Sequence, residues 1–364
     1  MKIVFCIKKL SGVSGGAEWV LATVANGLAR RGHKIYVISF DNEGEKSFYG
    51  FSHSVEHIKL GATEFSVIST FKQFWRMKKA AVNLNPGVVF GFLPSTFVAL
   101  SLLFWFSKFK FVACEHIARD WYNGHWLKYL LVSFAGNVSC GMSFLSDEIA
   151  ESFGLVSKKR KLILHDPVRK MSKIADVMAP SKTYFTILNV GRLVEFKDQK
   201  TLIECFSRIR YDFPQWRLKI IGRGHLRAEL KSQIERLMVE DVVKILDYSD
   251  NIEEEYAMAD LFVVSSLYEG FGLVTAEASS AGLPCVGFAD CEGTNKIIQD
   301  GVNGVLVKHE GDRVGNLEIK LRELLADSKK MRYLGKNGLM RPKRYELENV
   351  LEKWEEAIAA VVVT

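Results

Sequence analysis

The feature that most constrains the fold is a repeated alternation of short apolar runs, glycine-containing loops and segments of helix length. The run KIVFCI begins at residue 2, a glycine loop follows it, and Val20, Val24 and Leu28 then recur at the spacing of a helix face. The run HKIYVISF follows from residue 33. A strand, a helix and a second strand in this order form parallel strands with a right-handed crossover, so the first half predicts a parallel sheet.

The second half repeats this alternation. Strand-length runs lie within residues 184–193, 216–224, 242–250, 261–266 and 283–288, and segments of helix length lie at 197–213, 225–238, 251–260 and 272–282. The polar turn around Pro180 separates the two patterns, and 364 residues are enough for two domains. We therefore expect α/β domains at residues 1–178 and 179–340, followed by an amphipathic C-terminal helix within 341–364.

Residues 88–106 carry no charge and are long enough for a transmembrane helix. Gly91, Pro94, Ser95 and Thr96 interrupt the run, as a strand, a turn and a helix start would. We favour a buried strand, turn and helix over a membrane span.

The N-terminus and the cysteines bear on the compartment. The first apolar stretch is only five residues long before Lys8, too short for the core of a signal peptide, so a strand is expected there. The six cysteines form no CxxC pair, which predicts neither a zinc site nor a disulfide framework. Buried, reduced thiols fit a cytoplasmic protein.

Charge is distributed unevenly along the chain. Residues 1–178 hold 23 Lys and Arg against 13 Asp and Glu, whereas residues 179–364 hold 26 against 29. Halves of opposite sign indicate different partners. The basic half fits an anionic partner, which can be a membrane surface, a phosphate-bearing acceptor or a nucleic acid.

Three loops follow predicted strands and open helices, where open α/β sheets bind ligands. In the first, Gly15 and Gly16 let the backbone approach an anion at a helix N-terminus, or simply form a flexible turn. In the second, Arg192 and Lys197 can neutralise a diphosphate, although two solvated surface charges also fit this spacing. Gly222 marks a further glycine turn after a strand, a weak signal by itself.

The third loop carries Glu269 and Glu277, eight positions apart, around the turn Gly270-Phe271-Gly272. Backbone amides at such a turn can face a phosphate or a sugar. Eight helical residues rise about 12 Å, roughly the reach from a ribose to a sugar across a diphosphate. On spacing alone, ordinary helix-surface charge explains the pair better.

Together the motifs become specific. GGAE after the first strand, GRLxxxK at the start of the second domain, and EGFGLVTAE with its continuation AGLPCVGF form an ordered set over nearly the whole chain. This set resembles the retaining glycosyltransferases of family 4, which have the α/β GT-B fold. That fold has two Rossmann-like domains that face each other across a cleft, with a C-terminal helix that returns toward the first domain.

The resemblance implies an activity. A hexose or an N-acetylhexosamine would move from a nucleotide-diphosphate sugar, with a UDP-sugar favoured, to a glycan or lipid-linked acceptor. The process would be bacterial cell-surface polysaccharide, lipopolysaccharide or glycoconjugate synthesis. No DxD motif occurs in a metal-binding context, so no metal and no other cofactor is expected, and the nucleotide-sugar is a substrate.

The resemblance also implies roles for residues. Arg192 and Lys197 would bind the donor diphosphate, Glu277 the ribose, and Glu269 would lie at the transferred sugar. His116, in ACEHIARDW after a strand, matches a first-domain histidine beside the donor sugar, although alone it would be read as structural. The expected donor-binding residues are Gly15, Gly16, Arg192, Lys197, Gly222, Tyr248, Glu269, Gly270, Phe271, Gly272, Leu273 and Glu277, and the expected catalytic residues are His116, Glu269, Arg192 and Lys197.

Two departures from the family pattern are visible. The chain has KILDYSD where relatives often have a glycine before the aromatic residue, which leaves the base contacts of Asp247 and Tyr248 open. LVEFKDQ lacks the frequent glycine after the lysine, a milder change.

Aromatic and basic residues interleave in the first domain, at residues 70–80, 104–111 and 119–131. A helix with an apolar core face and a basic solvent face explains each stretch alone equally well. Their concentration in the basic half favours peripheral contact with an anionic membrane surface, at the inner face of the cell membrane. Further bases within residues 157–170 add to this surface or form a solvated loop.

Three other functions compete with the transferase. A sugar-nucleotide epimerase can have the same fold, and a noncatalytic nucleotide-sugar-binding or carbohydrate-binding subunit would lack transfer, although the intact motif residues argue against it. A nucleic-acid-binding module would use the basic half. No recognition motif for nucleic acid is present and the second half is acidic, so no nucleic-acid partner is expected.

Overall fold

The structure is a computed structural model that describes residues 1–13, 15–62, 67–249, 251–339 and 343–363, apart from the side chains at 67 and 68. The chain divides into two compact units, Met1–Pro167 with Lys343–Thr364, and Val168–Pro342. The chain passes from the first unit to the second after Pro167, before the boundary expected between residues 178 and 179. Residues 168–179 pack with the second unit because Met171 and Val177 are buried in its core and Ala175 N donates to Ala281 O (2.8 Å).

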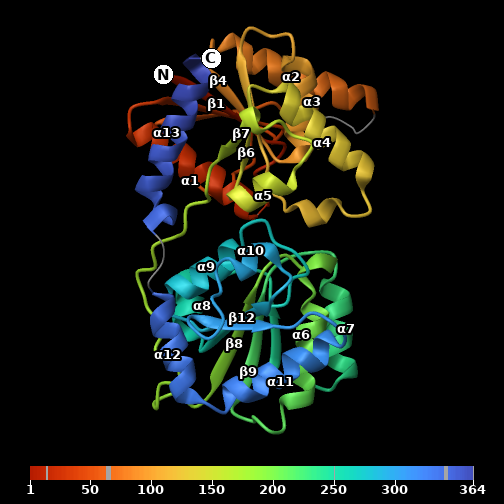
Figure 1. The fold of residues 1–364 in the computed structure, drawn as a ribbon, viewed down its shortest axis with the longest axis vertical. Helices are drawn as coiled ribbons and strands as arrows, with labels where there is room; N and C mark the ends of the chain where they lie inside the picture. Colours follow the sequence, from red (N-terminus) through yellow and green to blue (C-terminus); the bar gives the residue numbers. More distant parts are fainter. Residues whose placement is uncertain (14, 63–66, 250, 340–342, 364) are drawn as a thin grey trace. The chain divides into compact units, whose positions relative to one another are not determined.

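The first unit contains a parallel sheet with the strand order β3-β2-β1-β4-β5-β6-β7 (Figure 1). The strands are β1 (Lys2–Cys6), β2 (Lys34–Ser39), β3 (Val55–Lys59), β4 (Val88–Phe92), β5 (Lys110–Cys114), β6 (Gly141–Phe144) and β7 (Lys161–Ile163). Ile3 of β1 is in register with Ile35 on one side and Val88 on the other. The central strands are buried on both faces, which explains their nearly unbroken apolar runs.

The helices of this unit include the C-terminal one. They are α1 (Gly16–Arg30), α2 (Val67–Asn83), α3 (Pro94–Phe104), α4 (Trp126–Val138), α5 (Asp147–Ser152) and α13 (Leu347–Val363), with short 3-10 turns at Arg119–Tyr122, Lys158–Arg160 and Lys343–Tyr345. On α13, the Trp354 ring lies 5.1 Å from Phe90 and 5.9 Å from Phe5, between ring centroids. The expectation that the C-terminal helix returns to the first domain is confirmed.

The uncharged run 88–106 forms a strand and a helix. β4 ends at Phe92, Leu93 has a left-handed backbone (φ 66°), and Pro94 occupies the first turn of α3. A proline fits there because the first N–H groups of a helix have no intrahelical partner. Within the described residues, no helix has the length and apolar character needed to span a membrane.

The second unit contains a parallel sheet with the strand order β10-β9-β8-β11-β12-β13. The strands are β8 (Phe185–Val190), β9 (Trp216–Ile221), β10 (Val243–Leu246), β11 (Leu261–Val264), β12 (Cys285–Phe288) and β13 (Gly304–Val307). The helices are α6 (Gln199–Ile209), α7 (Arg227–Arg236), α8 (Ile252–Met258), α9 (Leu273–Ser280), α10 (Glu292–Asn295), α11 (Arg313–Leu325) and α12 (Ser328–Gly338), with a 3-10 turn at Glu195–Lys197. Figure 1 shows α6, α7 and α11 on one side of the strands and α8, α9 and α12 on the other.

Both sheets reverse their strand order beside their first strand, as a doubly wound Rossmann-like sheet does. The reversal lies between β1 and β4 in the first unit and between β8 and β11 in the second. Open α/β sheets bind ligands outside the carboxyl ends of the strands at such a reversal. In the second unit, the loops that begin after Val190 and after Val264 meet this condition.

Candidate functional site

The loops after β8 and β11 are bonded to each other. Leu267 N donates to Phe196 O (2.8 Å), and Ser265 Oγ donates to Lys197 O (3.0 Å). Arg313 of α11 donates from Nη2 to Ser265 O (3.1 Å). Hydrogen bonds that involve the backbone therefore fix the two loops side by side, and with them the side chains that they carry.

Lys197 and Glu269 form an ion pair across these loops. The Lys197 ammonium bonds Glu269 Oε1, and Ser266 Oγ donates to the same oxygen (2.7 Å). Both charged side chains are only slightly exposed, 13% for Lys197 and 11% for Glu269. An ammonium has three donors, so Lys197 can hold Glu269 and still donate to a phosphate oxygen.

Arg192 lies at the end of β8 with its side chain exposed. Its guanidinium carbon lies 5.5 Å from the centroid of the Phe196 ring, and Lys197 Nζ lies 5.7 Å from the same centroid. Phe196 in turn stacks on Tyr268 of the other loop, at 5.0 Å between centroids. No ion pair to the Arg192 guanidinium forms within the described part of the chain. Two cations thus share one aromatic ring, and the outer one is exposed to solvent.

The turn before α9 needs its second glycine. Gly272 has a φ of +81°, in the left-handed region that favours glycine, and its carbonyl accepts from Thr275 N and Ala276 N. Phe271 is buried and Gly270 is half-buried in the same turn. The N–H groups of Leu273 and Val274 precede the first of these bonds and have no acceptor within the helix, and the helix dipole favours an anion there.

Glu277 of α9 is buried, with 6% of its surface exposed. Tyr256 of α8 donates its hydroxyl to Oε2 (3.1 Å), and Arg169 Nε lies 3.6 Å from Oε1. Burial raises the pKa of the Glu277 carboxyl above its ordinary value, while the Arg169 cation and the Tyr256 hydrogen bond act to lower it. Glu277 is a supported buried carboxylate rather than a helix-surface charge.

The sequence analysis did not identify four residues of this arrangement. Tyr256 and Arg169 support Glu277, Ser266 supports Glu269, and Arg313 holds the loop at Ser265. Tyr256 falls in a predicted helix whose apolar face only indicates burial, and Arg169 falls in a basic stretch that fits a solvated loop. For Ser266, the available signal is a serine two residues after the end of a strand.

The structure gives Gly222 a steric role. A Cβ on Gly222 would lie 1.8 Å from Gly191 O, and the Gly222 N–H already donates to Leu246 O (2.9 Å). Only a glycine lets the ends of β8 and β9 approach this closely. Tyr248 is 48% exposed, with the Arg223 guanidinium 4.6 Å from its ring centroid, so its ring can stack with a further planar group.

In the first unit, Gly15 caps α1 and Gly16 begins it, after β1. A Cβ on Gly15 would lie 2.1 Å from Glu18 Oε2. The buried Glu18 carboxylate therefore lies at the helix N-terminus for which the sequence predicts an anion, where the helix dipole favours its charge.

His116 follows β5 in the same unit. Its ring stacks on Phe92 at 5.0 Å between centroids, and its Nδ1 lies 3.4 Å from Asp166 Oδ1. Neither ring nitrogen has a hydrogen-bond partner among the described residues, although the side chain is almost fully buried. Such a group is available to a ligand. The preceding Glu115 is buried, and its carboxylate accepts hydrogen bonds from Tyr122 and from Ile117 N.

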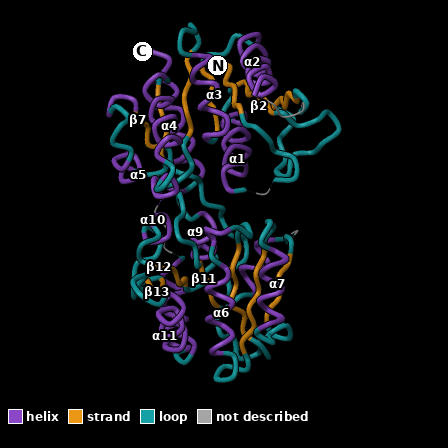
Figure 2. The backbone as a smooth tube through the Cα atoms, turned by 90° about the vertical axis from the view of Figure 1, so that its right-hand side faces the viewer, coloured by secondary structure: helices purple, strands orange, loops and turns teal. Residues whose placement is uncertain are grey.

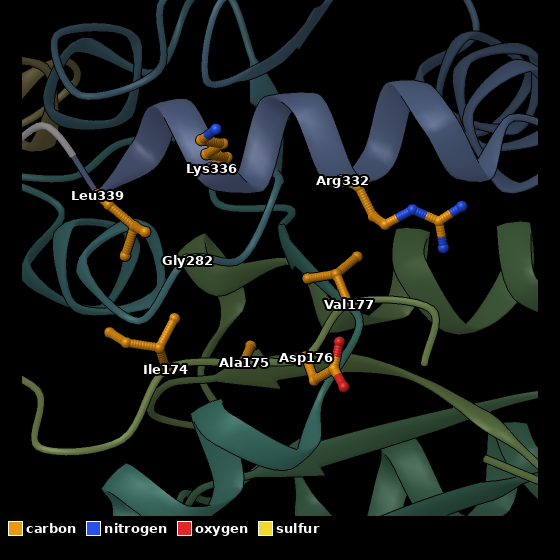
Figure 3. Close-up of a pocket in the computed structure, with 8 residues that line it drawn as sticks. All are labelled: Ile174, Ala175, Asp176, Val177, Gly282, Arg332, Lys336 and Leu339. Atoms are coloured by element: carbon orange, nitrogen blue, oxygen red, sulfur yellow. The ribbon is translucent and has the colours of Figure 1, made fainter. Parts of the chain in front are cut away.

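Arg192, Lys197 and the predicted residues from Glu269 to Glu277 lie in the two loops and in α9. Gly222 and Tyr248 follow the neighbouring strands β9 and β10, and Gly15, Gly16 and His116 lie in the first unit. A separate cavity of about 170 Å³ lies between α12 and residues 174–177, and no predicted site residue lines it (Figure 3). In the described residues, no three His, Cys, Asp or Glu side chains are grouped to hold a metal ion.

Two family models match the chain in succession. The model described as "Glycosyltransferase Family 4" matches residues 14–163, and the model described as "Glycosyl transferases group 1" matches residues 171–341. The first match lies in the first unit and the second in the second unit.

Relatives match along the full length. An uncharacterized glycosyltransferase of Haemophilus influenzae is 25% identical over 97% of this chain and 99% of its own length. An α-1,4-N-acetyl-D-galactosaminyltransferase of Campylobacter jejuni is 27% identical over 99% of both chains. The solved structure of Anabaena HepE covers 99% of this chain and 100% of its own, with a TM-score of 0.81 and 18% identity, a likeness of fold alone. The chain belongs to the group 1 glycosyltransferases of family 4, with the GT-B fold.

Proposed function

We propose that this glycosyltransferase transfers a hexose or an N-acetylhexosamine, with retention of the anomeric configuration, from a nucleotide-diphosphate sugar to a glycan or lipid-linked acceptor. A UDP-sugar is the favoured donor. The process is the synthesis of a bacterial cell-surface polysaccharide, lipopolysaccharide or glycoconjugate, and it takes place at the cytoplasmic face of the membrane.

The pairing of Lys197 with Glu269 beside the first turn of α9 carries this proposal. It gathers a cation, a carboxylate and helix N–H groups at the strand-order reversal, the chemistry that a sugar diphosphate requires. Glu277, farther along α9, supplies a buried acceptor for ribose hydroxyls.

The roles follow from the charge that develops in the reaction. Cleavage of the bond between the sugar and the phosphate leaves positive charge at the anomeric carbon and negative charge on the departing diphosphate. Arg192, Lys197 and the N-terminus of α9 stabilise that negative charge. Glu269 binds the transferred sugar, and Lys197 orients the Glu269 carboxylate through their ion pair. The acceptor hydroxyl attacks from the side that the diphosphate leaves, and the departing phosphate oxygen takes its proton.

Related proteins support the substrate classes. One solved structure of HepE is a complex with UDP and glucose, and another is a complex with UDP-glucose. The name of the Campylobacter jejuni relative specifies an acceptor glycan on PP-undecaprenol. A relative from Erwinia amylovora, 25% identical, is an amylovoran biosynthesis glycosyltransferase.

Calorimetry of the full chain with UDP, GDP and ADP tests the donor assignment, and UDP is expected to bind most tightly. A thermal-shift screen of UDP-hexoses and UDP-N-acetylhexosamines then identifies the sugar, and the NMR coupling of the anomeric proton in the product tests retention. Absence of binding to all three nucleotides would overturn the proposal. An inverted product would overturn retention alone.

A further inference from the structure

We propose that one face of the first unit docks on an anionic lipid bilayer. This aromatic–basic face is formed by α2, α3, α4 and the residues after α3, and α3 lies between the other two helices (Figures 1 and 2). Its exposed large apolar residues are Phe71, Trp75, Leu102, Trp105, Phe106, Trp126, Leu127, Leu130, Leu131 and Phe134. Its exposed bases are Lys72, Arg76, Lys79, Lys108 and Lys128.

Helix α4 is apolar on both of its sides. Val132, Ala135 and Gly136 face the core. Trp126 and Leu130 belong to an apolar stripe on the outward side, where their side chains are exposed. A helix that is apolar all round is normally buried in protein or in lipid. The outward stripe is exposed in the structure, so the described residues of the first unit do not cover it.

Contacts join the three helices into one continuous surface. The rings of Trp105 and Phe134 meet edge to face at 5.2 Å between centroids, which links the end of α3 to α4. Lys78 Nζ lies 5.3 Å from the Trp75 ring and 5.7 Å from the Phe104 ring, which links α2 to α3. Phe106, beside Trp105, is 90% exposed. Apolar side chains on a monomer are normally scattered, so a continuous set of this size marks an interaction surface.

The charges on this face identify its partner. Residues 65–114 contain six Lys and Arg but no Asp or Glu, and α4 adds Lys128 without any acid. A second copy of the chain would bring like charges together in a symmetric interface, which opposes dimerisation there. Anionic phosphates attract these bases, and Trp and Phe are favoured at the level of lipid headgroups. The bilayer surface therefore complements both the bases and the aromatic residues of this face.

The structure refines the extent of this surface. The apolar stripe continues along α4 to Phe134, beyond the stretch 119–131 that the sequence singles out, whereas Tyr122 of that stretch is buried. The inference rests on the proposed function only in that a lipid-linked acceptor gives membrane binding a purpose. The binding itself is independent of the donor.

Vesicle co-sedimentation of the full chain tests this proposal. The probes are vesicles of phosphatidylcholine alone and of phosphatidylcholine with phosphatidylglycerol, and UDP calorimetry is run on the same samples. We expect wild type to bind the anionic vesicles and to be released by high salt. The variant Phe106→Ser/Trp126→Ser and the variant Lys72→Glu/Lys79→Glu should each lower the partition coefficient about tenfold or more.

Matched controls lie in the second unit. Tyr211→Ser removes a ring that is 78% exposed, and Lys329→Glu/Lys330→Glu reverses two exposed lysines. Both controls should bind vesicles like wild type, and every variant should bind UDP like wild type. Loss of UDP binding in wild type would contradict the proposed function without touching the vesicle result.

Three outcomes would overturn the membrane proposal. They are a wild-type chain that stays in solution with anionic vesicles, equal binding by wild type and both face variants, and a dimer that the face variants convert to a monomer without any vesicle binding. Light scattering after gel filtration measures the last.

Discussion

Glu269 and Glu277, which both follow β11 in the chain, lie in different surroundings. Glu269 is paired with Lys197 and Ser266 at the edge of the loops, whereas Glu277 is buried between Tyr256 and Arg169. A buried carboxylate must be hydrogen-bonded or paired, because it has lost its hydration. Tyr256 and Arg169 supply this support from the chain itself, so they fix the position of the carboxylate that is proposed to bind the ribose hydroxyls.

Lys197→Ala should lower the turnover of the donor by about 10²- to 10³-fold, because it removes a cation proposed to stabilise the leaving diphosphate. Release of UDP from the donor sugar measures this loss. Lys200→Ala is the matched control, since Lys200 is exposed and its ion pair with Glu229 lies on the surface. Near-normal turnover by a folded Lys197→Ala variant would contradict the assignment.

Glu277→Ala should chiefly weaken UDP binding, measured by calorimetry, because the proposed ribose contact is lost. Glu277→Gln keeps the shape and removes the charge. A carboxylate whose pKa is raised by burial becomes protonated as the pH falls, so wild-type affinity for UDP should decline toward acid pH more steeply than that of Glu277→Gln. Parallel pH profiles for the two proteins would show that Glu277 does not contact the nucleotide as a carboxylate.

At the scale of elements, periodicity predicted much of the fold. The central strands of both sheets and the break at Leu93 follow from apolar runs and from glycine and proline signals. The contact between Lys197 and Glu269 could not be predicted from spacing, because it depends on β8 and β11 being neighbours, which is a property of the strand order. The sequence indicates a domain boundary later in the chain than the observed one, because the turn at Pro180 is a clear local signal whereas the packing of Met171 in the second core is not visible in the sequence.

The end of β5 supplies a prediction on pH. Burial raises the pKa of Glu115 from 4.5 to about 7, so the folded protein holds this proton more tightly than the unfolded chain does. The resulting stabilisation is complete below the ordinary pKa and is lost as the pH rises through about 7. Glu115→Gln keeps the partners Tyr122 and Ile117 and removes the titration.

We therefore expect the free energy of unfolding of wild type to fall relative to Glu115→Gln between mildly acid and mildly alkaline pH, by an amount on the order of a few kcal/mol. Urea unfolding followed by tryptophan fluorescence measures it. Six of the seven tryptophans lie in the first unit, so the signal reports mainly on the unit that contains Glu115. Equal pH dependence in both proteins would show that Glu115 titrates normally.

At the scale of the whole molecule, the chain builds its first unit from both of its ends. Helix α13 lies on α1 and β4, where Arg31 pairs with Glu348 and Glu355, each at 2.7 Å. The second unit is formed by one continuous segment and contains Arg192, Lys197 and Glu277, the side chains proposed to hold the diphosphate and the ribose. Stability of the first unit and nucleotide binding by the second should therefore respond to different substitutions.

Trp354→Ala tests this separation. Trp354 is 2% exposed and contacts Phe5 and Phe90, so its truncation leaves a large cavity and should cost the first unit about 3–5 kcal/mol. Urea unfolding followed by tryptophan fluorescence should shift to a lower midpoint, while calorimetry at a temperature where the variant is folded should give wild-type affinity for UDP. A matched substitution in the second core, Trp216→Ala, should destabilise the second unit and abolish UDP binding at a lower temperature than in wild type, because Trp216 is buried in that core. Equal loss of UDP binding in both variants would mean that the nucleotide site depends on the first unit as strongly as on the second.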